Sequence, residues 1–158
     1  MENISLLLEA ASKKLMIADH LIYVTFPLIK EKRLLIKILN ELYFSLLNSI
    51  NALLQYEHAY KRIALYKDPK LNFKTFLQQS PKFGISNNEL QIIIEIFSLI
   101  EKHKQSSMEF IKNEKFVILS NNLNIDTVTL EKLKEYLAAT KNIFKKTEYI
   151  IKTAKSKY

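Results

Sequence analysis

The stretch KRLLIKILNELYFSLLNSINALLQYEHAYKRIALYK, residues 32–67, decides the fold class of this chain. Its apolar residues recur at steps of three and four, the spacing of one face of an α-helix. That face covers more than half of the helix circumference, so more than one neighbouring helix must pack against it. The residues of this face are Leu35, Leu39, Leu42, Leu46, Leu53, Tyr60 and Ile63, widened by Tyr43, Ile50 and Leu54. The pattern therefore predicts a helix about 50 Å long within a helical bundle.

The residue composition excludes several classes of protein. The 158 residues include one Gly, three Pro and no Cys. Glycine supplies the left-handed turns and close backbone approaches of phosphate-binding loops, so its shortage excludes P-loops, dinucleotide fingerprints, nucleophile elbows and many-stranded sandwiches. The absence of Cys excludes disulfides, thiolate nucleophiles and thiolate metal sites. We expect one all-α domain over residues 1–158.

Local signals place the other helices on either side of the long one. Pro27 should end or kink the first helix at Phe26. The residues Ser86-Asn87-Asn88-Glu89 form a capping box at the start of a third helix, and Thr129 is a plausible N-cap for the last. Short links place neighbouring helices antiparallel, which predicts an antiparallel four-helix bundle. The predicted ranges are 3–26, 32–67, 87–106 and 130–155, with a short extra helix over 72–79.

A small β-hairpin is predicted between the third and fourth helices. Residues 115–119 are β-branched and aromatic, and residues 125–128 continue that pattern. The sequence Ser120-Asn121-Asn122 between them is a turn signal.

The charge of the chain suggests nucleic acid as one class of partner. Lys and Arg number 24 against 16 Asp and Glu, a net charge of +8, and lysines bind phosphates by releasing counterions. Only Arg33 and Arg62 supply the guanidinium groups that favour bidentate contacts. Residues 1–79 carry 11 basic and 7 acidic side chains and residues 80–158 carry 13 and 9, so a basic tail is absent. Solubility is the alternative role of this charge.

Lysines on the last predicted helix form the clearest basic pattern. Lys134, Lys141, Lys145 and Lys152 fall on one side of the helical wheel, where they could track a phosphate backbone. Glu148 lies beside them, and a solvated helix face is the alternative. The further candidates for nucleic-acid binding are Lys102 and Lys104.

His103 is the candidate catalytic residue, and Glu109, which follows it in the sequence, is the second candidate. His103 lies near the end of the third helix, where the helix dipole favours an imidazolium, and imidazole exchanges protons near neutral pH. A half-buried histidine that caps carbonyl groups is the alternative. His20 and His58 are too far along the chain to form a helical metal pair with it. We expect neither a metal site nor a cofactor.

Two carboxylates lie on apolar helix faces. Asp19 falls among Leu and Ile side chains of the first helix, and Glu57 does so in the second. They are interpreted as buried polar groups, either in a ligand-facing acid/base site or in a core hydrogen bond to Tyr, Ser or Lys. Antiparallel packing should keep the two carboxylates apart. Tyr23 is a third buried polar candidate.

The start of the chain and its hydropathy predict a cytoplasmic protein without a membrane segment. Met1-Glu2-Asn3-Ile4 is acidic where a secretory signal would be basic. The apolar stretch 42–54 is interrupted by polar residues and is too short to span a bilayer.

The order of these elements is similar to that of the HEPN superfamily of four-helix-bundle domains. The residues that carry the resemblance are 8–23, rich in Ala and Leu, and the longer helix over 38–56. Ribonucleases of that family carry an Arg followed a few residues later by a His at the end of the third helix. His103 lies in that neighbourhood, but neither Arg33 nor Arg62 precedes a His at such a spacing.

Three segments also resemble an uncharacterised family of small archaeal helical proteins: 18–28, 103–110 and 115–118. This resemblance implies an archaeal source and assigns no mechanism. It makes five residues the first to test, namely Asp19, His20, Tyr23, His103 and Glu109.

Together these observations predict a non-catalytic helical binding module, a homodimer or the partner of another protein, that contacts RNA or an RNA-associated partner. Two alternatives remain at this point. One is a HEPN-like, metal-independent ribonuclease or toxin-type enzyme that uses His103. The other is a protein–protein adaptor with no nucleic-acid role.

Overall fold

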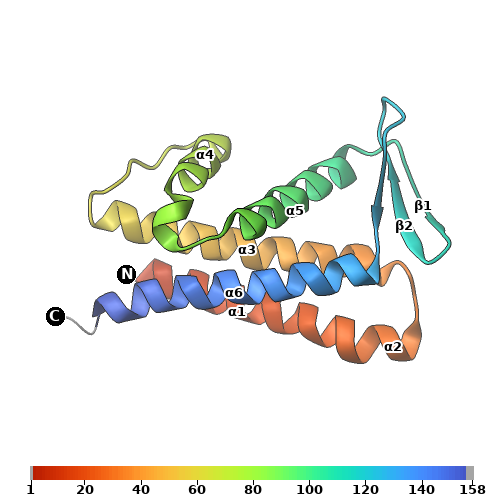
Figure 1. Ribbon diagram of the computed structural model, residues 1–158, viewed down its shortest axis with the longest axis horizontal. Coiled ribbons are helices and arrows are strands. Elements are labelled where there is room, and N and C mark those ends of the chain that lie inside the picture. Colours follow the sequence, from red (N-terminus) through yellow and green to blue (C-terminus); the bar gives the residue numbers. More distant parts are fainter. Residues whose placement is uncertain (1, 156–158) are drawn as a thin grey trace.

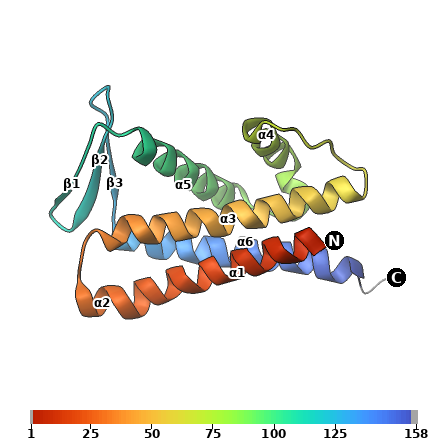
Figure 2. The ribbon, with the colours of Figure 1, turned by 180° about the vertical axis from the view of Figure 1, so that it is seen from behind.

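The structure is a computed structural model that describes residues 2–155, and these are mostly helical with one small antiparallel sheet. Three long helices run along one another in both views (Figures 1 and 2): α1 (Glu2–His20), α3 (Leu34–Ala59) and α6 (Leu130–Lys155). The prediction of a mainly helical chain is thereby confirmed. None of the helices in the described part is both long and apolar enough to cross a membrane.

Helix α3 is the most buried of the three, as its broad apolar face predicts. It packs against α1, α5 and α6. Its fully buried side chains include Leu35, Leu39, Leu42, Leu46 and Leu53. The predicted end at Lys67 is wrong, because the helix stops at Ala59.

A left-handed residue ends α3. Lys61 has φ of 59°, its N–H donates to the carbonyl of His58 at 2.9 Å, and the N–H of Arg62 donates to the carbonyl of Glu57 at 3.0 Å. This pair of bonds is a Schellman motif, which usually places glycine at the left-handed position. With Lys there, the sequence carries no glycine to mark the end.

Helical structure continues past Phe26, the residue at which Pro27 is predicted to end or kink the first helix, although α1 itself ends at His20. A π-helical segment (Leu21–Thr25) follows α1, and the short helix α2 (Phe26–Ile29) follows that. Pro27 lies in the first turn of α2, where its missing N–H is tolerated.

Two further helices begin at side-chain caps. Helix α4 (Pro69–Gln79) starts at Asp68, whose carboxylate accepts from the N–H of Lys70 at 2.9 Å, so it begins before the predicted residue 72. A 3₁₀ turn (Ser80–Phe83) leads to α5 (Asn87–Gln105). The predicted capping box of Ser86 and Glu89 is confirmed. Helix α5 crosses α3 and α6 obliquely (Figure 1).

The predicted hairpin is part of a three-stranded antiparallel sheet, in the order β1 (Met108–Lys112), β2 (Lys115–Leu119), β3 (Ile125–Val128). The pairing of β2 and β3 was predicted, whereas β1 was missed. Asn113 and Glu114 form the two-residue turn before β2, with φ of 49° and 66°. Asn-Gly is the usual sequence of such a turn, so Asn-Glu gives little signal.

Candidate functional site

His103 and Glu109 meet at the end of the molecule that carries the sheet. His103 lies in the last turn of α5 and Glu109 in β1, and the imidazole Nδ1 is 2.6 Å from a carboxylate oxygen of Glu109. The side chains are 29% and 24% exposed. A turn at Ser106, whose hydroxyl donates to the carbonyl of His103 at 3.0 Å, directs β1 back over the helix end. The two candidate catalytic residues therefore form one imidazole–carboxylate pair.

Such a pair can orient an imidazole for proton transfer, because a bond at one ring nitrogen directs the other outward. The basic groups beside it are already engaged. The ammonium of Lys102 is 3.1 Å from a carboxylate oxygen of Asp126, and that of Lys104 lies 5.7 Å from the ring centre of Tyr43.

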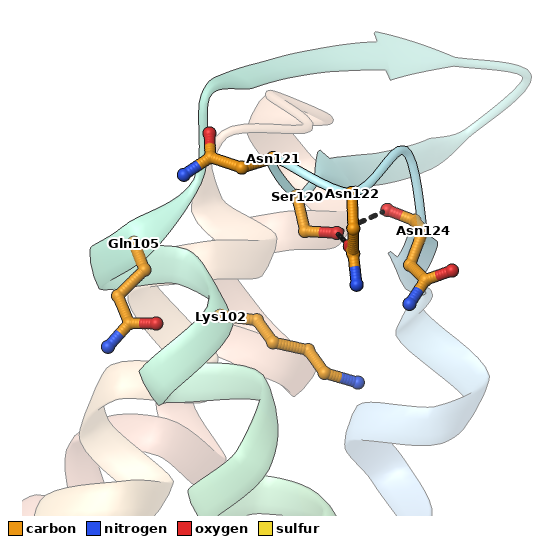
Figure 3. A pocket seen from close by; sticks show the side chains of 6 residues that line it. All are labelled: Lys102, Gln105, Ser120, Asn121, Asn122 and Asn124. Atoms are coloured by element: carbon orange, nitrogen blue, oxygen red, sulfur yellow. Dashed lines mark hydrogen bonds between the residues drawn. The ribbon is translucent and has the colours of Figure 1, made fainter.

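A polar cavity of about 400 Å³ lies beside Lys102 (Figure 3). Its other lining residues are Gln105, Ser120, Asn121, Asn122 and Asn124. Figure 3 shows Lys102 and Gln105 on the helix facing the β2–β3 loop, where Ser120 donates to the carbonyl of Asn124 at 3.2 Å. Its lining contains no aromatic ring, and its one cation is paired with Asp126. The cavity therefore suits neither base stacking nor strong anion binding.

The lysines predicted to form a basic face on α6 are mostly engaged within the protein. Lys141 bonds a carboxylate oxygen of Asp19 at 2.6 Å, and Lys152 bonds Glu148 at 3.1 Å. The ammonium of Lys134 lies 5.7 Å from the ring centre of Tyr23. Lys145 is exposed and forms no ion pair within the described residues. The face is thus not a continuous row of free cations.

The three predicted buried polar residues have different surroundings. Glu57 is buried, with 1% of its side chain exposed, and bonds Arg62 at 2.9 Å and Lys82 at 2.5 Å. The hydrogen bond to Glu57 raises the pKa of Arg62. The prediction that Asp19 is buried is wrong, because its side chain is 42% exposed and binds Lys141 at the surface. The two carboxylates therefore have separate partners.

The prediction that Tyr23 is buried is wrong, because 54% of it is exposed. It lies in the π-helical segment Leu21–Thr25. A π-turn contains an extra residue and shifts the positions that face inward. Leu21 and Ile22 are the buried residues of this segment.

A different basic surface was missed, namely the sequence YKRIALYKDPKLNFK, residues 60–74, which we name the α3–α4 segment. It joins α3 to α4 at the end of the molecule opposite the sheet (Figures 1 and 2). Its four lysines are exposed and form no ion pair within residues 2–155: Lys61, Lys67, Lys70 and Lys74. Tyr60 and Tyr66 are 40% and 50% exposed.

Internal bonds hold the α3–α4 segment in place. The guanidinium of Arg62 lies 4.9 Å from the ring centre of Tyr60 and bonds Glu57. The side chain of Asn72 accepts from the N–H of Tyr66 and donates to its carbonyl, each at 2.8 Å. Phe73 stacks on Phe97 of α5 at 4.7 Å between ring centres, which anchors α4. The exposed tyrosines and lysines therefore project from an ordered backbone.

Comparisons of the chain with protein-family models, curated proteins and solved structures find no match. Across residues 2–155, no cluster of three or more His, Asp or Glu side chains could hold a metal ion.

A signal for the α3–α4 segment was present in the sequence. It holds five basic residues and one acidic residue, with Tyr60 before them and Tyr66 among them. The two halves of the chain have similar net charge, so a charge count over each half does not reveal this cluster. The predicted helix over residues 32–67 would place Lys61 and Lys67 on a helical surface, but α3 ends at Ala59 and both lysines lie beyond it.

Proposed function

We propose that this chain is a non-catalytic helical module that binds RNA through the α3–α4 segment. The observation that carries the proposal is the cluster of four exposed lysines that form no ion pair within the described residues. Free lysines release counterions from a phosphate backbone and so supply affinity. On α6, by contrast, Lys141 and Lys152 would have to leave their carboxylates to bind a phosphate.

The local density of charge supports RNA binding over solubility as the role of these lysines. In 15 residues the segment has an excess of four positive charges, half of the net charge of +8. Solubility requires charge of either sign distributed over the surface, whereas a phosphate backbone is bound by cations gathered in one place.

Titration of a fluorescent single-stranded RNA tests this proposal. Affinity should fall steeply between about 50 and 200 mM salt. The triple variant Lys67→Gln/Lys70→Gln/Lys74→Gln should weaken binding and reduce the slope of log affinity against log salt by about 2, since each lost contact contributes about 0.7.

The matched control removes the same charge from exposed lysines elsewhere, as Lys37→Gln/Lys132→Gln/Lys145→Gln. It should bind nearly as well as the wild type. Equal losses in the two triple variants would mean that the segment is not the site.

The His103–Glu109 pair favours a second candidate function, a HEPN-like metal-independent ribonuclease. A carboxylate 2.6 Å from the imidazole supports acid/base work. Cleavage of RNA incubated with the wild type or with His103→Ala tests this second function. Cleavage by the wild type alone would support the enzyme, and equal cleavage or none would refute it.

The HEPN-like four-helix arrangement, an archaeal source, a cytoplasmic location and a homodimer belong to the same proposal. A light-scattering mass measurement tests the dimer. Protein binding without any RNA binding would favour the adaptor function instead.

A further inference from the structure

We infer that the α3–α4 segment selects single-stranded RNA, with Tyr60 and Tyr66 as platforms on which unpaired bases stack. This inference rests on the proposed function and names the form of RNA that the same site takes. It follows from three features: the exposure of the two rings, the support behind them and the lysines next to them.

Tyr60 is supported from within the protein and open to solvent. The Arg62 guanidinium lies 4.9 Å from its ring centre, and the ring of Tyr56 lies 5.0 Å away. Glu57 binds that guanidinium at 2.9 Å, which keeps Arg62 in position. The residue as a whole is 40% exposed, and the solvent-facing part of its ring is where a base would stack.

Tyr66 is exposed on a fixed backbone. Its N–H and carbonyl both bond the side chain of Asn72, so α4 determines where the residue lies. Half of the residue is exposed, and its ring contacts no other aromatic ring among residues 2–155. A ring that projects from an ordered backbone loses little conformational entropy on binding.

Each tyrosine is followed by a lysine in the sequence, Lys61 after Tyr60 and Lys67 after Tyr66. Lys70 and Lys74 lie one turn apart on α4 and continue the cationic surface. Alternating rings and cations match the alternating bases and phosphates of a single strand. In a duplex the base faces are stacked on one another, so the tyrosines would have nothing to bind.

The test compares one U-rich RNA of twelve nucleotides, labelled with fluorescein, with its duplex formed on the complementary strand. The variant Tyr60→Leu/Tyr66→Leu removes the aromatic rings and keeps apolar side chains. It should lose about tenfold or more in affinity for the single strand. Its affinity for the duplex and its salt slope should be unchanged, because the lysines remain.

The matched control is Tyr23→Leu/Tyr149→Leu, which removes two other exposed tyrosines, and it should bind the single strand like the wild type. The single variant Tyr66→Leu keeps the test decisive if the double variant fails to fold. Equal wild-type affinity for single strand and duplex, or no loss in the tyrosine variant, would overturn this inference and leave the proposed function standing. Binding of neither RNA, including the case where only anionic lipid vesicles bind, would overturn both.

Discussion

The lysines of α6 and those of the α3–α4 segment differ in what lies next to them. On α6, Lys134, Lys141 and Lys152 each face an aromatic ring or a carboxylate of the protein. Asp19 on α1 pairs with Lys141, Tyr23 of the π-helical segment lies beside Lys134, and Glu148 one turn earlier on α6 pairs with Lys152. The α3–α4 segment lies at one end of the molecule (Figure 1), and its lysines form no ion pair among the described residues. The position of a lysine on a helical wheel therefore does not decide whether it is free to bind.

If α6 serves mainly to stabilise the fold, truncating its inner face should have the largest effect. Leu137 is 2% exposed. Leu137→Ala should lower the free energy of unfolding by about 2–5 kcal/mol, from lost burial and a residual cavity. Urea denaturation measures this loss. The folded variant should still bind RNA, and an unchanged midpoint would contradict the packing of α6.

Glu57 should matter both to stability and to the α3–α4 segment. Glu57→Gln weakens the buried bonds to Arg62 and Lys82, with an expected loss of about 1–2 kcal/mol in unfolding free energy. Because Arg62 supports Tyr60, affinity for single-stranded RNA should fall as well. The exposed Glu101→Gln serves as the control. A variant that loses stability and keeps full affinity would show that Arg62 does not position Tyr60.

The pH dependence of stability should reveal the ion pair between Lys146 of α6 and Glu89. Burial alone would raise the pKa of Glu89, but the hydrogen bonds from Lys146 and Ser86 outweigh it, and the pKa lies below its ordinary value of 4.5. A lowered pKa means that this stabilisation is present above pH 4.5 and is lost as the pH falls through the folded-state value. Urea midpoints measured between pH 6 and pH 3 should therefore fall less in Glu89→Gln than in the wild type. Parallel pH profiles would contradict the ion pair with Lys146.

The elements that the sequence predicted well carry their signals locally. Ser86 with Glu89 marks the start of α5, and Thr129, whose hydroxyl accepts from the N–H of Lys132 at 3.2 Å, marks that of α6. The end of α3 was missed because Lys61 takes the left-handed position without glycine. The start and end of a helix are thus predictable where a side chain makes the cap.

The candidate site was less predictable than the fold, because its properties depend on contacts between distant parts of the chain. Asp19 and Lys141 are 122 residues apart and form an ion pair. His103 and Glu109 were both proposed, yet their bond depends on the turn at Ser106, which no sequence signal marked. The density of charge along the chain can be predicted from the sequence. Which charges form ion pairs depends on how the helices pack, and this the sequence alone does not show.

The smallest expected effects distinguish the two lysine-rich regions most sharply. Lys141→Gln breaks a half-exposed ion pair and should cost about 0.5 kcal/mol in unfolding free energy, with little change in RNA affinity. Lys70→Gln removes an exposed cation that pairs with no carboxylate in residues 2–155, so stability should stay within about 0.5 kcal/mol while RNA affinity and its salt slope fall. Paired measurements of thermal unfolding and RNA titration give both quantities for each variant. The reverse pattern would be a loss of RNA affinity in Lys141→Gln and unchanged affinity in Lys70→Gln. It would place the RNA on α6, because Lys141 would then have to exchange Asp19 for a phosphate.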